Sequence, residues 1–148
     1  MLQLTNITKT FNPGTITEKK ALRGVDLVLD DGDFVTVIGG NGAGKSTLLN
    51  IIAGVHYTDT GSIKLNDINL TRRPEHIRAK YLGRVFQDPM MGTAANMSIE
   101  ENLAMAYRRG KRRGLAWYIK NSEKEFYREK LALLDLGLEN RMQAKVGL

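Results

Sequence analysis

Apolar and polar residues alternate at the beginning of the chain. Leu2 and Leu4 fall on one face of an extended segment, and Ile7 continues the apolar pattern. The run Phe11-Asn12-Pro13-Gly14 then breaks it. A period of two is typical of a strand with one buried face, so the sequence predicts a strand from Leu2 to Thr10.

Two further apolar runs lie on either side of a polar turn. Residues 21–29 resume a strand pattern, and the turn that follows them is Asp30-Asp31-Gly32-Asp33. After it, residues 34–38 read Phe-Val-Thr-Val-Ile, which is typical of a buried strand because it is apolar and β-branched. We therefore predict an antiparallel hairpin formed by these two runs.

A glycine-rich loop separates the run 34–38 from a segment with helical spacing. Leu48 to Ala53 carries apolar residues at that spacing, and Gly54 stands where a glycine would end the helix. Between the predicted strand and helix, residues 39–47 match G-x-x-x-x-G-K-[ST] at every fixed position. A strand, this loop and a helix in succession predict a phosphate-binding P-loop.

The residue types in this loop suit a nucleotide polyphosphate. Glycines let the backbone adopt positive φ and bring its N–H groups close to phosphate oxygens, and the helix N-terminus adds partial positive charge. Lys45 would reach the β and γ phosphates, Ser46 would offer its hydroxyl to Mg²⁺, and Thr47 would contact the α phosphate. The predicted nucleotide-binding residues of the loop are Gly39, Asn41, Gly42, Ala43, Gly44, Lys45, Ser46 and Thr47.

Shorter elements follow the predicted helix. A turn at 58–61 leads into a short strand at 62–65, and Asn66-Asp67 forms the next turn. Pro74 is suited to the first position of a short helix through Lys80. Residues 81–86 are predicted to form another strand, which ends at Gln87-Asp88-Pro89.

From Ser98 onward the pattern is helical. Two segments, Ser98-Ile99-Glu100-Glu101 and Ser122-Glu123-Lys124-Glu125, have the sequence of a capping box, so each predicts a helix start. We expect the second helix to end at Gly137. It presents an apolar stripe that we interpret as core: Phe126, Tyr127, Leu131, Leu134 and Leu136.

Composition narrows the class of protein. The 148 residues are 42% hydrophobic, which suits a globular domain, and no apolar run approaches the ~18 residues of a membrane span. Cysteine is absent, which excludes disulfides and thiolate metal sites and fits a cytoplasmic protein. The formal net charge is +6, with a basic cluster at residues 108–113. This cluster fits a solvated helix end, a contact near a membrane, or nucleic acid.

Several motifs in fixed order resemble the ATP-binding subunits of ABC transporters. They are Phe11 after the first strand, the P-loop, Thr60-Gly61-Ser62-Ile63, Val85-Phe86-Gln87-Asp88-Pro89 and Met97-Ser98-Ile99-Glu100-Glu101-Asn102-Leu103. The resemblance covers essentially the whole chain. It implies an α/β fold, the P-loop NTPase fold of the ABC ATPase type, with an antiparallel β subdomain, a partial parallel core sheet and the start of a helical subdomain. Residues 1–95 would form the nucleotide-binding core and residues 96–148 part of the helical subdomain.

The resemblance also implies roles for individual residues. Phe11 would stack on the adenine ring of ATP, and Gln87 would contact Mg²⁺ or the water near the γ phosphate. Lys45 and Gln87 would thus be the catalytic residues of the chain, and Ser46 and Gln87 the Mg²⁺ ligands. The partners implied are a membrane-spanning subunit, contacted through the helical subdomain and the Gln87 loop, and a second ATPase subunit in a head-to-tail dimer. The protein would then be cytoplasmic and peripheral to the inner face of the cell membrane.

The sequence departs from the family after Gln87. It contains no later apolar strand ending in Asp-Glu, and the signature Leu-Ser-Gly-Gly-Gln is absent. We therefore expect the chain to be the N-terminal portion of an ATPase that couples ATP hydrolysis to solute transport, and to bind ATP without efficient turnover. Two alternatives stay open: a soluble ABC-type ATPase acting on nucleic acid or ribosomes, a partner class that we consider less fitting, and a non-hydrolysing nucleotide-binding fragment.

Overall fold

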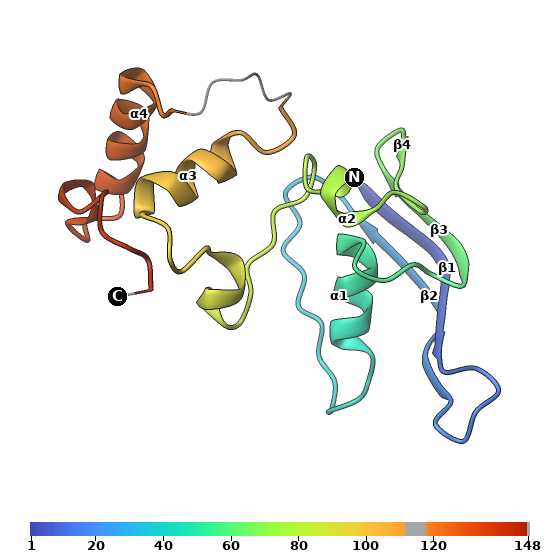
Figure 1. Cartoon of the computed structure of the whole chain (residues 1–148). Coiled ribbons are helices and arrows are strands. Elements are labelled where there is room, and N and C mark those ends of the chain that lie inside the picture. Colours follow the sequence, from blue (N-terminus) through green and yellow to red (C-terminus); the bar gives the residue numbers. More distant parts are fainter. Residues whose placement is uncertain (112–117, 148) are drawn as a thin grey trace. The chain divides into compact units, whose positions relative to one another are not determined.

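The chain folds into two compact units, residues 1–82 and residues 83–148 (Figure 1). The computed structural model describes residues 1–111 and 118–147, so Arg112 and Arg113 of the basic cluster lie outside the described residues. Each unit has its own hydrophobic core. None of the helices formed by the described residues is long and apolar enough to cross a membrane.

The first unit contains a four-stranded sheet in the order β2-β1-β3-β4. All of its strand pairs are antiparallel, and the strands are β1 (Leu2–Phe11), β2 (Lys19–Leu29), β3 (Thr60–Leu65) and β4 (Ile68–Asn69). The strands predicted near residues 2–10, 21–29 and 62–65 are therefore confirmed. β1 is central, with Leu4 opposite Leu27 of β2 and Ile63 of β3.

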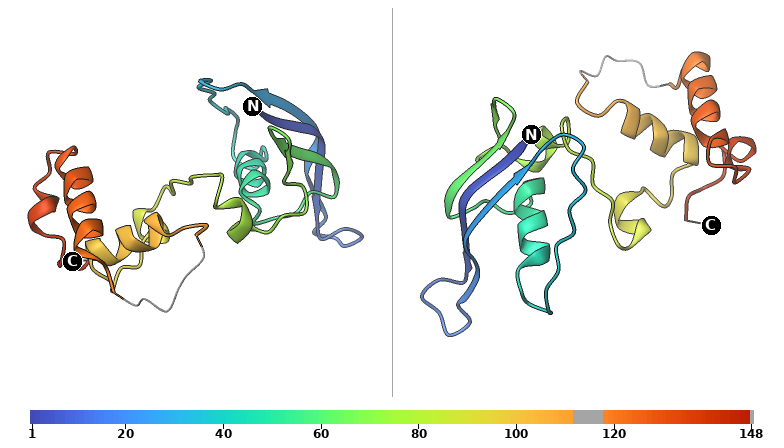
Figure 2. Two further views of the ribbon diagram at one scale, coloured as in Figure 1. Left: turned by 90° about the horizontal axis from the view of Figure 1, so that it is seen from above. Right: turned by 180° about the vertical axis from the view of Figure 1, so that it is seen from behind.

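Helix α1 (Lys45–Ala53) lies along one face of this sheet, as Figures 1 and 2 show. It has the predicted spacing of apolar residues, and Leu48 and Ile51 both face the core because residues three apart lie on the same face of a helix. Gly54 ends the helix as predicted, with φ of 89°. The core between helix and sheet consists of Leu4, Ile7, Leu22, Leu48, Ile51, Ile63 and Leu70.

The strand predicted at Phe34–Ile38 does not form. The segment runs without strand pairing, and the side chains of Phe34 and Ile38 are 94% and 89% exposed. The predicted hairpin is also wrong, since β2 pairs with β1, although the turn exists with Asp33 N donating to Asp30 O at 3.2 Å. A strand needs a neighbour to satisfy its backbone groups, and the described residues offer this segment none.

The strand predicted at residues 81–86 is wrong for the same reason. This segment has no strand pairing, and Val85 is 97% exposed. Within the described ranges every strand pair is antiparallel, so the parallel part of the expected sheet is not formed there. Apolar, β-branched composition favours a strand but does not supply the partner that completes it.

Helix α2 (Glu75–Arg78) confirms the short helix predicted near Pro74, although Pro74 occupies the N-cap and not the first helical position. Its last residue, Arg78, is fully buried. The guanidinium donates to the carbonyls of Ile51 at 2.7 Å and Ile52 at 2.9 Å, in the last turn of α1. Burial lowers the pKa of Arg78 from its usual value, and the carbonyl dipoles of the helix end compensate its charge.

The second unit is helical. Its elements are η1 (Pro89–Gly92), α3 (Ile99–Tyr107), α4 (Asn121–Ala132) and η2 (Leu138–Asn140), and its core is Ala104, Tyr127, Leu131 and Met142. The capping box at Ser98 is confirmed, because Glu101 N donates to Ser98 Oγ at 3.2 Å and Ser98 N donates to Glu101 Oε2 at 2.7 Å.

Helix α4 begins earlier and ends earlier than predicted. Its N-cap is Lys120, whose N–H donates to Glu123 Oε2 at 2.9 Å, and the predicted cap Ser122 lies inside the first turn. Arg108 holds the same carboxylate at 2.8 Å, which fixes Glu123 at this position. The helix stops at Ala132, not at Gly137. Of the predicted core stripe, Tyr127 and Leu131 are buried, whereas Phe126, Leu134 and Leu136 are exposed.

Candidate nucleotide-binding site

The predicted P-loop wraps into the N-terminus of α1. Gly42 and Gly44 have φ of 81° and 90°, in the left-handed region that favours glycine. An ideal Cβ built on Gly44 would lie only 2.6 Å from the carbonyl oxygen of Ala21 in β2. Any larger residue at position 44 would therefore push the loop away from the sheet.

The first turn of α1 carries free hydrogen-bonding capacity. Its N-cap is Gly44, which has no side chain to bond the first N–H groups, and no acidic residue lies in the first turn. The early N–H groups of a helix have no partner within the helix, and together with the helix dipole they favour an anion. The arrangement around α1 thus fits a phosphate group.

Lys45 closes the loop. Its Nζ donates to the carbonyl oxygens of Gly39 at 2.5 Å and Gly40 at 2.8 Å, which places the ammonium at the start of the loop. Ser46 is exposed at the second helical position and Thr47 is half-buried at the third, so both hydroxyls lie in the first turn. This order of an ammonium and two hydroxyls at a helix N-terminus can bind a polyphosphate and its magnesium ion.

Phe11 is the last residue of β1 and is half-buried. Its ring contacts the ring of His56 edge-on, with centroids 5.3 Å apart and an interplanar angle of 78°. The ammonium of Lys9 lies 5.7 Å from the Phe11 centroid. The ring of Phe11 therefore packs against the segment that follows α1, in the same unit as the P-loop.

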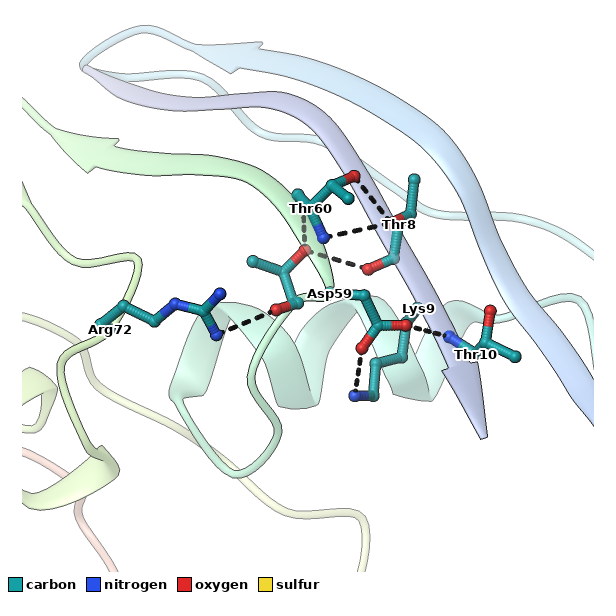
Figure 3. A network of polar contacts seen from close by, with 7 residues as sticks. Thr8, Lys9, Thr10, Asp59, Thr60 and Arg72 are labelled. Carbon is teal, nitrogen blue, oxygen red and sulfur yellow. Dashed lines mark hydrogen bonds and ion pairs between the residues drawn. The ribbon is translucent and has the colours of Figure 1, made fainter. Parts of the chain in front are cut away.

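A polar network anchors this end of β1 to the segment between α1 and β3, as Figure 3 shows. The carboxylate of Asp59 accepts from Thr10 N at 2.6 Å and from Lys9 Nζ at 2.7 Å. The hydroxyls of Thr8 and Thr60 meet at 2.8 Å. The hydrogen bond from Lys9 keeps the pKa of Asp59 below its usual 3.8. From the sequence, Asp59 was placed in a turn, and this role in holding the strand was missed.

Gln87 belongs to the second unit. It is exposed and lies two residues before η1, whose N-cap Asp88 accepts through its side chain from Met90 N at 2.9 Å. The structure thus gathers the P-loop residues around α1 in the first unit, with Phe11 at the end of β1, whereas Gln87 is exposed at the beginning of the second unit.

Comparison with known proteins gives a consistent result. The family model described as ABC transporter matches residues 22–146. The tyrosine transport ATP-binding protein of Clostridioides difficile is 42% identical over 116 residues, covering 75% of this chain and 44% of that protein. The sulfate/thiosulfate import ATP-binding protein CysA of Methylococcus capsulatus is 39% identical over 107 residues, covering 72% and 28%.

Solved structures extend the likeness to the fold. A nucleotide-free ATP-binding cassette from an ABC transporter superimposes with a TM-score of 0.72 at 30% identity, covering 99% of this chain and 58% of the other. A dimeric cassette in a post-hydrolysis state bound to ADP and Pi gives 0.72 at 28% identity, covering 98% and 61%. The chain therefore spans less than half of these two curated relatives and about 60% of the solved cassettes.

The predicted fold class is confirmed by these neighbours, and their likeness agrees with the glycine conformations and the lysine contacts of the P-loop. The chain belongs to the ABC transporter family, and it has the P-loop NTPase fold of an ATP-binding cassette.

Proposed function

We propose that this chain is the ATP-binding part of an ABC transporter ATPase, and that in the complete protein ATP binding and hydrolysis drive solute transport. The observation that carries the proposal is the loop before α1, where Gly42 and Gly44 adopt left-handed conformations and Lys45 closes the loop. Mg²⁺-ATP is the ligand that this combination of backbone N–H groups, ammonium and hydroxyls suits best.

Each residue has a distinct task in the proposed complex. The N–H groups from Gly42 to Thr47 bind phosphate oxygens, and Lys45 exchanges its carbonyl partners for the β and γ phosphates. Ser46 and Gln87 hold Mg²⁺, which neutralises charge on the polyphosphate when bound. Phe11 stacks on adenine, because an aromatic face binds a base without needing hydrogen bonds.

Hydrolysis belongs to the complete protein. Phosphoryl transfer needs a carboxylate that supports Mg²⁺ and a group that positions the attacking water, and the sequence after Gln87 has neither an Asp-Glu strand end nor the signature motif. The chain alone then binds Mg²⁺-ATP without efficient turnover. In the transporter, residues 96–148 and the Gln87 loop contact the membrane-spanning subunit on the cytoplasmic side, and a second ATPase subunit completes the site.

A titration tests the proposal. The full chain is titrated with a fluorescent ATP analogue with and without Mg²⁺, alongside Lys45→Ala and, as a matched control, Lys64→Ala, because Lys64 is an exposed residue of β3. We expect Lys45→Ala to weaken binding at least tenfold, because it removes a charged hydrogen-bond donor to phosphate, and Lys64→Ala to bind like the wild type. Equal binding by the wild type and Lys45→Ala, or none by a folded wild type, contradicts it.

A further inference from the structure

A second lysine reaches the P-loop from the sheet. Lys19 is the first residue of β2, and its register partner across the strand pair is Phe11. An ideal Cβ built on Gly42 would lie 3.4 Å from Nζ of Lys19. The ammonium of Lys19 therefore lies beside Gly42, in the middle of the loop whose N–H groups we assign to phosphate binding.

The position of Lys19 is well defined by its neighbours in β2. The P-loop packs on the same part of the strand, because Gly44 has room for no side chain against Ala21 O and lies beside Leu22. Leu22 is buried in the core beneath α1. Only Lys20 lies between Lys19 and Ala21, so the backbone of Lys19 is held at a fixed distance from the loop.

Lys19 has no competing carboxylate among the residues described here. Lys9, which also lies near Phe11, is engaged by Asp59 at 2.7 Å. Lys19 takes part in none of the ion pairs of residues 1–111 and 118–147. An exposed ammonium against a P-loop glycine, without an acid of its own, is suited to receive a phosphate oxygen.

We propose that Lys19 is a second phosphate-binding cation, which contacts the polyphosphate of the bound nucleotide from β2. Lys45 and Lys19 then bring two ammonium groups to one loop, the first from the helix and the second from β2. This inference rests on the proposed nucleotide function. It adds a binding residue for the polyphosphate that lies outside the P-loop motif, in a different strand.

Competition experiments on the full chain test this role. ATP, inorganic tripolyphosphate and AMP are each used to displace the fluorescent analogue from the wild type and from Lys19→Gln and Lys19→Arg. The control variant is Lys20→Gln, because successive side chains of a strand alternate and Lys20 therefore belongs to the other face of β2. Lys19→Gln should weaken ATP and tripolyphosphate about tenfold, the usual size of a lost charged hydrogen bond, and AMP less than threefold. Lys19→Arg should restore most of the affinity, and Lys20→Gln should match the wild type.

The possible failures are distinct. If Lys19→Gln binds ATP within twofold of the wild type, or loses ATP and AMP equally, Lys19 is no phosphate ligand and the inference is wrong. If Lys19→Arg is as weak as Lys19→Gln, the loss reflects shape and not charge, which also overturns it. If Lys45→Ala binds as well as the wild type, the proposed nucleotide function itself fails, whatever Lys19 does.

Discussion

Replacing Arg78 should destabilise the helix that carries the P-loop. Arg78 is fully buried and donates four hydrogen bonds to carbonyls, of Ile51, Ile52, Arg73 and Thr71, at 2.7, 2.9, 2.7 and 3.2 Å. The substitution Arg78→Met keeps most of the aliphatic stem but removes all four donors. The carbonyls of Ile51 and Ile52 then lose partners in the last turn of α1.

The magnitude follows from the cost of unpaired acceptors. A buried acceptor left without a partner costs about 1–3 kcal/mol. Ile51 O keeps the N–H of Gly54 at 3.2 Å, whereas the carbonyls of Ile52, Thr71 and Arg73 lose the guanidinium. Because these three are only partly buried, the lower part of that range applies and together they cost about 3–6 kcal/mol. The burial of the guanidinium itself is unfavourable, as the lowered pKa of Arg78 shows, and its removal offsets part of that loss. We therefore expect Arg78→Met to lower the free energy of unfolding by about 3 kcal/mol.

Urea denaturation measures this change, and hydrogen exchange of the α1 amides shows where it acts. The matched control is Arg72→Met, because Arg72 is exposed and makes one hydrogen bond, to Thr58 O at 3.2 Å. It should cost less than about 1 kcal/mol. Arg78→Lys should fall between the two, since an ammonium cannot reproduce the fork of a guanidinium. The reasoning is refuted if Arg78→Met is no less stable than Arg72→Met.

Two other substitutions test the polar contacts of each unit. Asp59→Asn should lower the free energy of unfolding by about 0.5–1 kcal/mol at neutral pH, because solvent screens the partly exposed ion pair between Asp59 and Lys9. Because the pKa of Asp59 is lowered in the folded protein, the wild type is the more stable of the two above about pH 4 and loses this advantage as the pH falls below 3.8. The free energies of unfolding of the two proteins, measured with urea, should therefore become equal in acid. A constant difference down to pH 2 contradicts this. Ser98→Ala should cost about 1 kcal/mol by removing the cap of α3, whereas Ser122→Ala, inside the first turn of α4, should be near neutral. Thermal unfolding of the pair checks the order, and a larger effect at Ser122 would restore the capping box predicted there.

The local signals in the sequence were strong where a few neighbouring residues decide the structure. The P-loop helix with Gly54 at its end, and the helix that begins after Ser98, depend on caps and spacing within a few residues. The strand at residues 34–38 depends on a neighbouring strand, which its own composition cannot reveal, and there the prediction failed. The predicted start of α4 was wrong for a different reason. The carboxylate of Glu123 accepts from Lys120 N and is held in place by Arg108, which lies fifteen positions before Glu123 in the sequence.

Some residues at the candidate site could be predicted from a local motif, whereas others depend on the tertiary structure. The motif identifies Lys45, and the left-handed conformations of Gly42 and Gly44 are of the kind for which the motif's glycines are suited. Arg78 and Lys19 carry no sequence signal, because a single charged residue in a short helix or at a strand start is typical of a solvated surface. Their placement depends on where α2 and β2 meet the P-loop helix and its loop, which only the tertiary structure defines.

The most direct test of nucleotide binding at this site is an amide map of the isotopically labelled full chain. Proton–nitrogen spectra are recorded as Mg²⁺-ADP is added to the wild type and to Lys45→Ala. We predict that the largest shifts occur at Gly39 to Leu48, with Phe11 and Lys19 also affected, and that they are lost in the variant. A folded wild type whose amides from Gly39 to Leu48 do not respond, or whose shifts centre on the second unit, would contradict the account.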